Sequence, residues 1–96
     1  MLTHIVVWKY KPEVSDEERT EHMRRLRALA DVIPEVVLLR VGGDMLHLAR
    51  SYDTGLVAEF HDRAGLDAYT IHPTHEEVAA LGRRISQHVA SVDFED

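Results

Sequence analysis

The chain contains no cysteine, which excludes disulfides, thiolate metal ligands and a cysteine nucleophile. It also lacks a basic excess, because 17 acidic residues against 11 basic ones give a net charge of −6. Proteins that neutralise phosphates need a basic face, so we expect no nucleic acid partner. No apolar run is long enough to span a bilayer, and the first residues lack the features of a signal peptide. The sequence therefore predicts a cytoplasmic protein with no membrane partner.

What is present is typical of one globular domain. The chain has 96 residues, of which 45% are hydrophobic and 29% charged. This length supports a single core but not two. Without an internal repeat, a low-complexity segment or a linker, residues 1–96 are predicted to form one domain.

The N-terminal segment, residues 2–11, has the composition of a strand that ends at Pro12. Alternation of side chains puts the following residues on one face: Leu2, His4, Val6, Trp8 and Tyr10. Ile5 and Val7 lie on the opposite face, so both faces of this strand are apolar and need covering. We expect helices on one face and a second copy of the chain on the other.

Two capping boxes predict helix starts, Ser15 to Glu18 and Thr74 to Glu77. The first helix then presents Met23, Leu26, Ala30 and Ile33 as its apolar stripe and ends at Pro34; the later helix presents Val78, Leu81 and Ile85. Asp62 is predicted to cap a short helix that runs to Tyr69.

Further strands are predicted over residues 36–41, 55–61 and 89–94. Residues 45–54 carry no clear pattern, since Leu46 and Leu48 fit a strand while residues 50–53 fit a loop. The resulting β-α-β-β-α-α-β order predicts an α+β, ferredoxin-like sandwich: a four-stranded antiparallel sheet with helices on one face. Its open face would meet a second copy in a homodimer.

Residues 69–75 hold the densest group of proton-transferring side chains, namely Tyr69, His72 and His75. In a functional interpretation, His75 is a base that takes a proton next to a carbonyl and Tyr69 donates to the oxyanion. His4 on its apolar face needs a polar partner, and Asp93 could orient a ring nitrogen. In a structural interpretation, both histidines satisfy backbone groups between two helices and Tyr69 is a core aromatic.

The remaining charged and ionisable residues suggest no metal or cofactor. His72, His75 and Glu76 could contribute ligands, but Pro73 breaks the spacing and no third ligand is evident. His22, His47, His61 and His88 look like surface or edge residues. Arg83 and Arg84 are interpreted as part of a solvated helical face.

Several segments together resemble one known family. They are Met1-x-Thr3-His4-Ile5-Val6-Val7-Trp8-Lys9, Ile33-Pro34-x-Val36, Phe60, Tyr69-x-x-His72-Pro73-x-His75 and Val92-Asp93-Phe94-Glu95. The chain resembles the stress-responsive A/B barrel domain (Dabb) family over essentially its whole length. The resemblance implies a homodimeric α+β barrel in which each subunit has a pocket between its sheet and its helices.

The resemblance also implies candidate site residues. Most members of the family have no assigned reaction, but one branch, olivetolic acid cyclase, performs an aldol cyclisation without metal or cofactor. Motif positions give Tyr69 and His75 as candidate catalytic residues. The pocket positions that match or lie on the same strand face are His4, Val6, Trp8, His72 and Asp93. Trp8 stands where the cyclase has a smaller side chain, so a long alkyl substrate is not expected.

Three functional hypotheses follow. The first is a stress-responsive barrel protein of unassigned activity that binds a small molecule in its pocket. The second is a cofactor-independent cyclase or lyase that uses His75 as base and Tyr69 as oxyanion donor. The third, a cofactor-free monooxygenase-like protein, rests on fold analogy.

Overall fold

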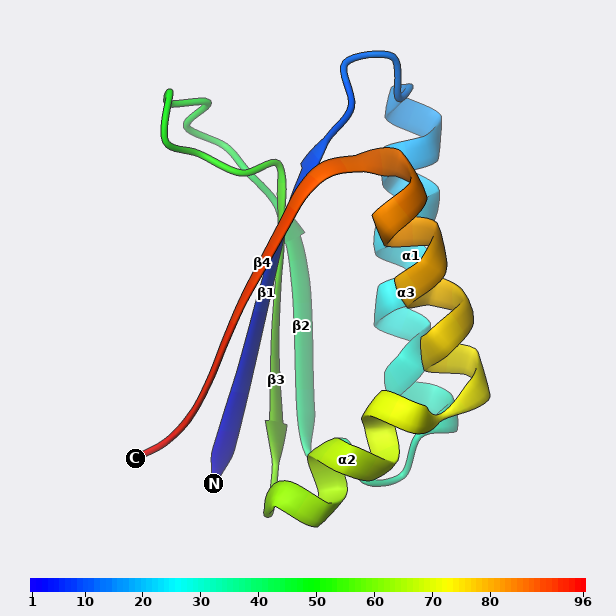
Figure 1. Cartoon of the computed structure of the whole chain (residues 1–96), viewed down its shortest axis with the longest axis vertical. Coiled ribbons are helices and arrows are strands. Elements are labelled where there is room, and N and C mark those ends of the chain that lie inside the picture. Colours follow the sequence, from blue (N-terminus) through cyan, green and yellow to red (C-terminus); the bar gives the residue numbers. More distant parts are fainter.

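All 96 residues are described by the computed structural model, which contains four strands and three helices. In chain order these are β1 (Leu2–Tyr10), α1 (Asp16–Val32), β2 (Leu38–Gly43), β3 (Thr54–Phe60), α2 (Arg63–Ile71), α3 (Pro73–Ile85) and β4 (Ser86–Glu95). The strands form one antiparallel sheet in the order β2-β3-β1-β4. The helices all cover the same face of this sheet (Figure 1). The predicted ferredoxin-like α+β architecture is confirmed.

Strand β1 is central in the sheet, and its alternation is as predicted. Leu2, Trp8 and Tyr10 are buried beneath the helices, while Ile5 and Val7 lie on the bare face and are only half-buried. Register pairs Ile5 with Val57 of β3 and with Val92 of β4. The bare face therefore continues as an apolar surface across three strands.

Helix α1 starts at the predicted capping box. The Ser15 hydroxyl accepts a hydrogen bond from the Glu18 N–H at 3.1 Å, and the Glu18 carboxylate accepts one from the Ser15 N–H at 3.1 Å. The predicted apolar stripe is wrong in one respect, because Ala30 is exposed and His22 is fully buried. His22 is therefore not a surface residue. It can replace an apolar side chain because the Tyr10 hydroxyl lies 2.8 Å from its Nδ1.

Strand β2 begins and ends two residues later than predicted, because Gly42 and Gly43 pair with Gly55 and Thr54 instead of stopping the strand. Residues 44–53 form a loop, so Leu46 and Leu48 do not continue the strand. This loop projects beyond the sheet on the side away from the helices (Figure 1). Strand β4 starts at Ser86, directly after α3 and earlier than the predicted residue 89.

The junction between α2 and α3 differs from the prediction at one cap. Asp62 caps α2 as expected, its carboxylate accepting from the Gly65 N–H at 2.9 Å. The Thr74–Glu77 capping box is wrong, since the N-cap of α3 is His72, whose Nδ1 accepts from the Thr74 N–H at 3.1 Å. Pro73 at the first helical position explains the difference, because its fixed φ favours starting the helix there.

Two surfaces of the sheet contrast sharply. Beneath the helices lies a core of 13 buried hydrophobic residues. The bare face carries apolar side chains that remain exposed: Leu38, Val57, Val92 and Phe94. None of the helices is both long and apolar enough to cross a bilayer.

Candidate functional site

A cavity of ≈ 270 Å³ lies between the sheet and the helices. Its apolar wall is built from three strands and α1 by Val6, Trp8, Leu26, Leu56 and Val89. Its polar groups are His4, Tyr69, His75, Arg83 and Ser91, with Ala79 between the α3 residues. The cavity is therefore an apolar pocket with a few convergent polar groups, which is the usual character of a small-ligand site.

Tyr69 and His75 form the closest pair of polar side chains in this cavity. Their ring centroids are 4.3 Å apart, and Tyr69 is only 2% exposed. Burial raises the pKa of Tyr69 to about 12, so the phenol stays protonated at neutral pH. Its hydroxyl makes no hydrogen bond within the chain and is thus free to donate to a ligand.

His75 is oriented by the end of the preceding helix. Its Nδ1 lies 3.0 Å from the Thr70 carbonyl oxygen, which can only accept, so Nδ1 carries the proton. In the neutral ring, Nε2 then holds a free electron pair. Burial lowers the pKa of His75, with the backbone bond to Thr70 acting in the opposite direction. The imidazole is therefore neutral at pH 7 and available as a base.

His4 is held from the edge of the sheet. It pairs with Asp93 in the β1–β4 register, and its Nδ1 is hydrogen-bonded to the Asp93 carboxylate. The His4 ring lies 5.9 Å from the Tyr69 ring and edge-on to it. Asp93 therefore orients His4, while the Thr70 carbonyl orients His75. The two imidazoles flank Tyr69 from opposite layers of the fold.

The other predicted site residues divide into two groups. Val6 and Trp8 line the cavity, whereas His72 does not, since its ring is engaged in capping α3. Asp93 lies behind His4 rather than in the lining. His72 therefore bonds to a backbone group between two helices, as in the structural interpretation of the sequence.

Two contributors to the site were missed by sequence reasoning. The first is the Thr70 carbonyl, a backbone group that the residue type at this position does not indicate. Arg83 is exposed, as predicted for a solvated face, but it also lines the cavity, which was not predicted. Its spacing was a usable signal, because His75, Ala79 and Arg83 follow at i, i+4 and i+8 and so share one face of a helix.

A second tyrosine–histidine pair lies beyond Trp8, at the other end of the layer between sheet and helices. The Tyr10 hydroxyl donates to the Thr54 Oγ1 at 2.8 Å and accepts from the His22 Nδ1 at 2.8 Å. His22 Nε2 is buried and has no partner. Desolvation lowers the pKa of His22 to about 4, so this ring is neutral.

This second pair, which we call the closed pair, has no cavity beside it. A Cβ added to Gly82 would lie 2.8 Å from the Trp8 Nε1 and 3.1 Å from the His22 Nε2. The backbone of α3 thus fills the space next to the His22 ring. Nowhere in the chain do three histidine, aspartate or glutamate side chains converge as metal ligands would.

Comparison with known proteins identifies the family. Residues 2–96 match the stress-responsive A/B barrel domain, abbreviated Dabb. The chain belongs to this family. No curated protein matches the sequence of this Dabb domain.

Solved structures share its fold. A dimeric ferredoxin-like protein of unknown function from Thermobifida fusca YX is 25% identical, with a TM-score of 0.90, and the match covers 99% of this chain and 90% of that one. A protein of the same description from Jannaschia sp. CCS1 is 29% identical, with a TM-score of 0.84 and coverage of 99% and 98%. Hydroxynitrile lyase from Passiflora edulis is 18% identical, with a TM-score of 0.88 and coverage of 97% and 90%. This last likeness concerns the fold alone.

Proposed function

We propose that this Dabb domain protein binds a small carbonyl compound in the cavity beside Tyr69 and His75. The observation that carries the proposal is the Tyr69 hydroxyl, which is protonated and has no hydrogen-bond partner in the chain. This oxygen is not among the buried polar atoms that lack a partner, so the hydroxyl opens to the cavity, where a ligand can replace water as its acceptor. A carbonyl oxygen is an acceptor and matches this donor.

The cavity also limits the ligand. Its volume of ≈ 270 Å³ lies just below the usual range of ligand pockets, so only a small ligand fits. Trp8 occupies one end of the wall, next to the closed pair, and prevents extension in that direction. A compact ligand with an apolar body and one carbonyl group suits these dimensions.

A second candidate function, enolisation of the bound carbonyl compound, is favoured by the orientation of His75. With Nδ1–H donating to Thr70, Nε2 can remove a proton from the carbon next to the carbonyl. The C–H bond breaks, an N–H bond forms, and the electron pair moves to give an enolate oxygen. That oxygen accepts a hydrogen bond from Tyr69. Such a step begins aldol cyclisation. The fold analogy with hydroxynitrile lyase from Passiflora edulis is compatible with lyase chemistry, but it supports no more than the fold.

The experiment measures deuterium exchange at the α-carbons of cyclohexanone in heavy water by NMR. We expect exchange above the buffer rate with the wild type, its loss in His75→Ala, and a loss of about 10²-fold or more in Tyr69→Phe. The matched control is His47→Ala, which removes an exposed imidazole far from the cavity and should exchange like the wild type.

NMR spectra of the same samples distinguish binding of the carbonyl compound from its enolisation. Shifts of His75 resonances on adding cyclohexanone, without exchange, would support binding and overturn enolisation. Equal exchange in wild type and His75→Ala would also exclude His75 as the base. Absence of any shift at Tyr69 or His75 at saturating cyclohexanone would overturn the binding proposal.

We also infer that the protein is a homodimer joined through the bare face of the sheet. The support is the exposed apolar surface of Leu38, Val57, Val92 and Phe94, together with the dimeric state described for both bacterial neighbours. Val7→Asp should convert a dimer into a monomer of 11.0 kDa in sedimentation, whereas Thr20→Asp on exposed α1 should not. A wild type that sediments as a monomer at micromolar concentration would exclude the dimer.

A cytoplasmic location and a role in a stress response complete the proposal. The location is supported by the sequence-based prediction of a cytoplasmic protein. The role in a stress response is supported by the description of the family as a stress-responsive domain. Cell fractionation and the transcript level under heat or oxidative stress test the two parts separately.

A further inference from the structure

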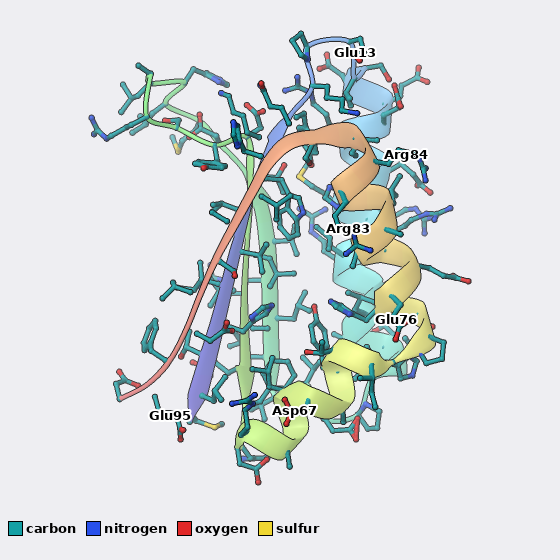
Figure 2. The ribbon with its side chains drawn as sticks, viewed as in Figure 1. Glu13, Asp67, Glu76, Arg83, Arg84 and Glu95 are labelled. Atoms are coloured by element: carbon teal, nitrogen blue, oxygen red, sulfur yellow. The ribbon has the colours of Figure 1, made fainter.

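Arg83 is a positive charge at the cavity that has no partner in the chain. Some arginines are paired, such as Arg24 with Glu21 at 2.7 Å and Arg63 with Asp67 at 2.9 Å. Arg40, Arg50 and Arg84 are unpaired like Arg83, but they do not line this cavity. Arg83 lines the cavity but makes no ion pair and no hydrogen bond within the chain. Figure 2 shows Arg83 on the side of α3 nearer the sheet, whereas the adjacent Arg84 points away from it.

The position of Arg83 on α3 directs it towards the Tyr69–His75 pair. Arg83 follows His75 by two helical turns, about 12 Å along the axis. Only Ala79 lies between them on this face of α3, and it leaves the space open. Side chains on a helix lean towards its N-terminus, so the long Arg83 side chain shortens this separation.

The electrostatics of the cavity favour an anion. Its lining includes the Arg83 guanidinium and no carboxylate, although the chain carries a net charge of −6. The Asp93 carboxylate lies behind this lining and is bonded to His4. The main cause of the lowered pKa of His75 is burial, and the charges of His4 and Arg83 lower it further against Glu76. The field of Arg83 therefore reaches the His75 ring.

We propose that Arg83 binds a carboxylate of the ligand, so that this site takes a compact oxo acid with its carbonyl at Tyr69 and its carboxylate at Arg83. The inference rests on the proposed function, because it deepens the choice of ligand for the same cavity. A planar guanidinium matches a carboxylate through two parallel hydrogen bonds. A phosphate would require more donors, and the lining offers neither a lysine nor a second arginine.

The apolar wall holds the chain between the two polar ends. Arg83 and Val89 both line the cavity and are both exposed, so the carboxylate end lies near solvent. Leu26 and Leu56 are buried deeper in the wall. An oxo acid thus keeps its charge near water while its hydrocarbon part contacts apolar side chains, which lowers the cost of desolvating the carboxylate.

The test compares levulinate, an oxo acid, with its neutral methyl ester in NMR titrations of the folded protein. We expect the wild type to bind levulinate about tenfold more tightly than methyl levulinate, in line with a charge-assisted hydrogen bond at a partly exposed site. The preference should disappear in Arg83→Gln and return in part in Arg83→Lys. The control Arg84→Gln removes the same charge one residue away and should keep the wild-type preference.

A second readout is the pKa of His75, followed by NMR. Bound levulinate neutralises Arg83 and should raise the pKa of His75, while methyl levulinate should leave it unchanged. Equal affinity for the two compounds, or a preference that survives Arg83→Gln, overturns the inference. Failure of levulinate to bind at all overturns it as well.

These outcomes remain distinct from those of the proposed function. If methyl levulinate and levulinate bind equally and both shift Tyr69 and His75, the carbonyl site stands and only the role of Arg83 is lost. If the preference depends on Arg83 but no α-carbon exchange occurs, the oxo-acid site stands and enolisation is lost.

Discussion

The chain contains two tyrosine–histidine pairs between its sheet and its helices, and they differ in what surrounds them. In the closed pair, Tyr10 and His22 bond to each other, Tyr10 also bonds to Thr54, and no space remains. In the open pair, Tyr69 and His75 lie in contact, but the hydroxyl has no partner in the chain and both rings face a cavity. The same two residue types, tyrosine and histidine, thus stabilise the core in the closed pair and are available to bind a ligand in the open pair.

The two pairs differ in how many of their hydrogen-bond donors and acceptors have partners within the chain. A buried tyrosine and histidine offer several donors and acceptors, and a stable core requires that most of them be satisfied internally. At the open pair, only His75 Nδ1 is satisfied, by the Thr70 carbonyl. A binding site needs donors and acceptors that have no partner in the chain and that face a cavity. The contrast between the two pairs can be tested by substituting the same residue types in both.

The largest contrast is expected in the response to acid. His22 has its pKa lowered to about 4 from 6.5, so the unfolded chain takes up a proton here more readily than the folded chain. Stability should therefore fall as the pH drops from 6.5 to about 4 and then level off for this group. At about 1.4 kcal/mol per pH unit, protonation at His22 lowers the free energy of unfolding by up to about 3 kcal/mol over this range.

Urea unfolding at a series of pH values measures this contribution. His22→Gln should flatten the wild-type profile between pH 6.5 and pH 4, although it is less stable at neutral pH. His75→Gln should flatten it less, since the pKa of His75 is lowered by a smaller amount. Parallel profiles for wild type and His22→Gln would contradict the neutral, desolvated state of His22.

The tyrosine hydroxyls should give the second contrast. Tyr10→Phe removes the acceptor for His22 and the donor for Thr54, leaving two buried groups without partners. We expect a loss of about 1–3 kcal/mol in the free energy of unfolding. Tyr69→Phe removes a hydroxyl that bonds to nothing in the chain, so a change within about 0.5 kcal/mol is expected.

Both variants keep the aromatic ring, which makes the packing term common to the two measurements. Equal destabilisation by Tyr69→Phe would mean that its hydroxyl has a structural partner, and the case for a ligand donor would fail. Ligand titration of the same samples completes the comparison, because Tyr10→Phe should retain the binding that Tyr69→Phe weakens.

The sequence predicted the elements well where the signals are local. Ser15 and Asp62 are caps whose bonds close within three residues, and the alternation of β1 follows from backbone geometry. The Thr74 cap failed because two local signals competed, and Pro73 prevailed. The fold class followed from the order of the elements, and the bare apolar face of the sheet from the alternation of β1, rather than from any single motif.

The candidate site was less accessible to sequence reasoning. Tyr69, His75 and His4 were found because they share a motif or a strand face. Nothing local distinguishes His22 from an exposed histidine, since its burial depends on Tyr10, which lies 12 residues away. Arg83 and Arg84 are equally alike in sequence, and only the packing of α3 against the sheet separates their roles.

The smallest contrast in stability, and the sharpest in binding, concerns two small residues of α3. Gly82→Ala would place a Cβ 2.8 Å from the Trp8 indole nitrogen, and the rigid buried ring cannot easily move. Overpacking of this kind costs about 1–3 kcal/mol, which exceeds the gain of about 1 kcal/mol in helix propensity. We expect a net loss of about 1 kcal/mol from Gly82→Ala.

Ala79→Leu, by contrast, extends a side chain into the cavity, where there is room for it. Stability should change by less than about 0.5 kcal/mol, because newly buried methyl groups offset the restriction of the side chain. Binding of cyclohexanone and levulinate should be lost, while Gly82→Ala keeps both. Thermal unfolding and NMR titration measure the two effects on one pair of variants. If Ala79→Leu destabilises the chain as much as Gly82→Ala, the space beside Ala79 is filled in solution, and the distinction between an open and a closed pair does not hold.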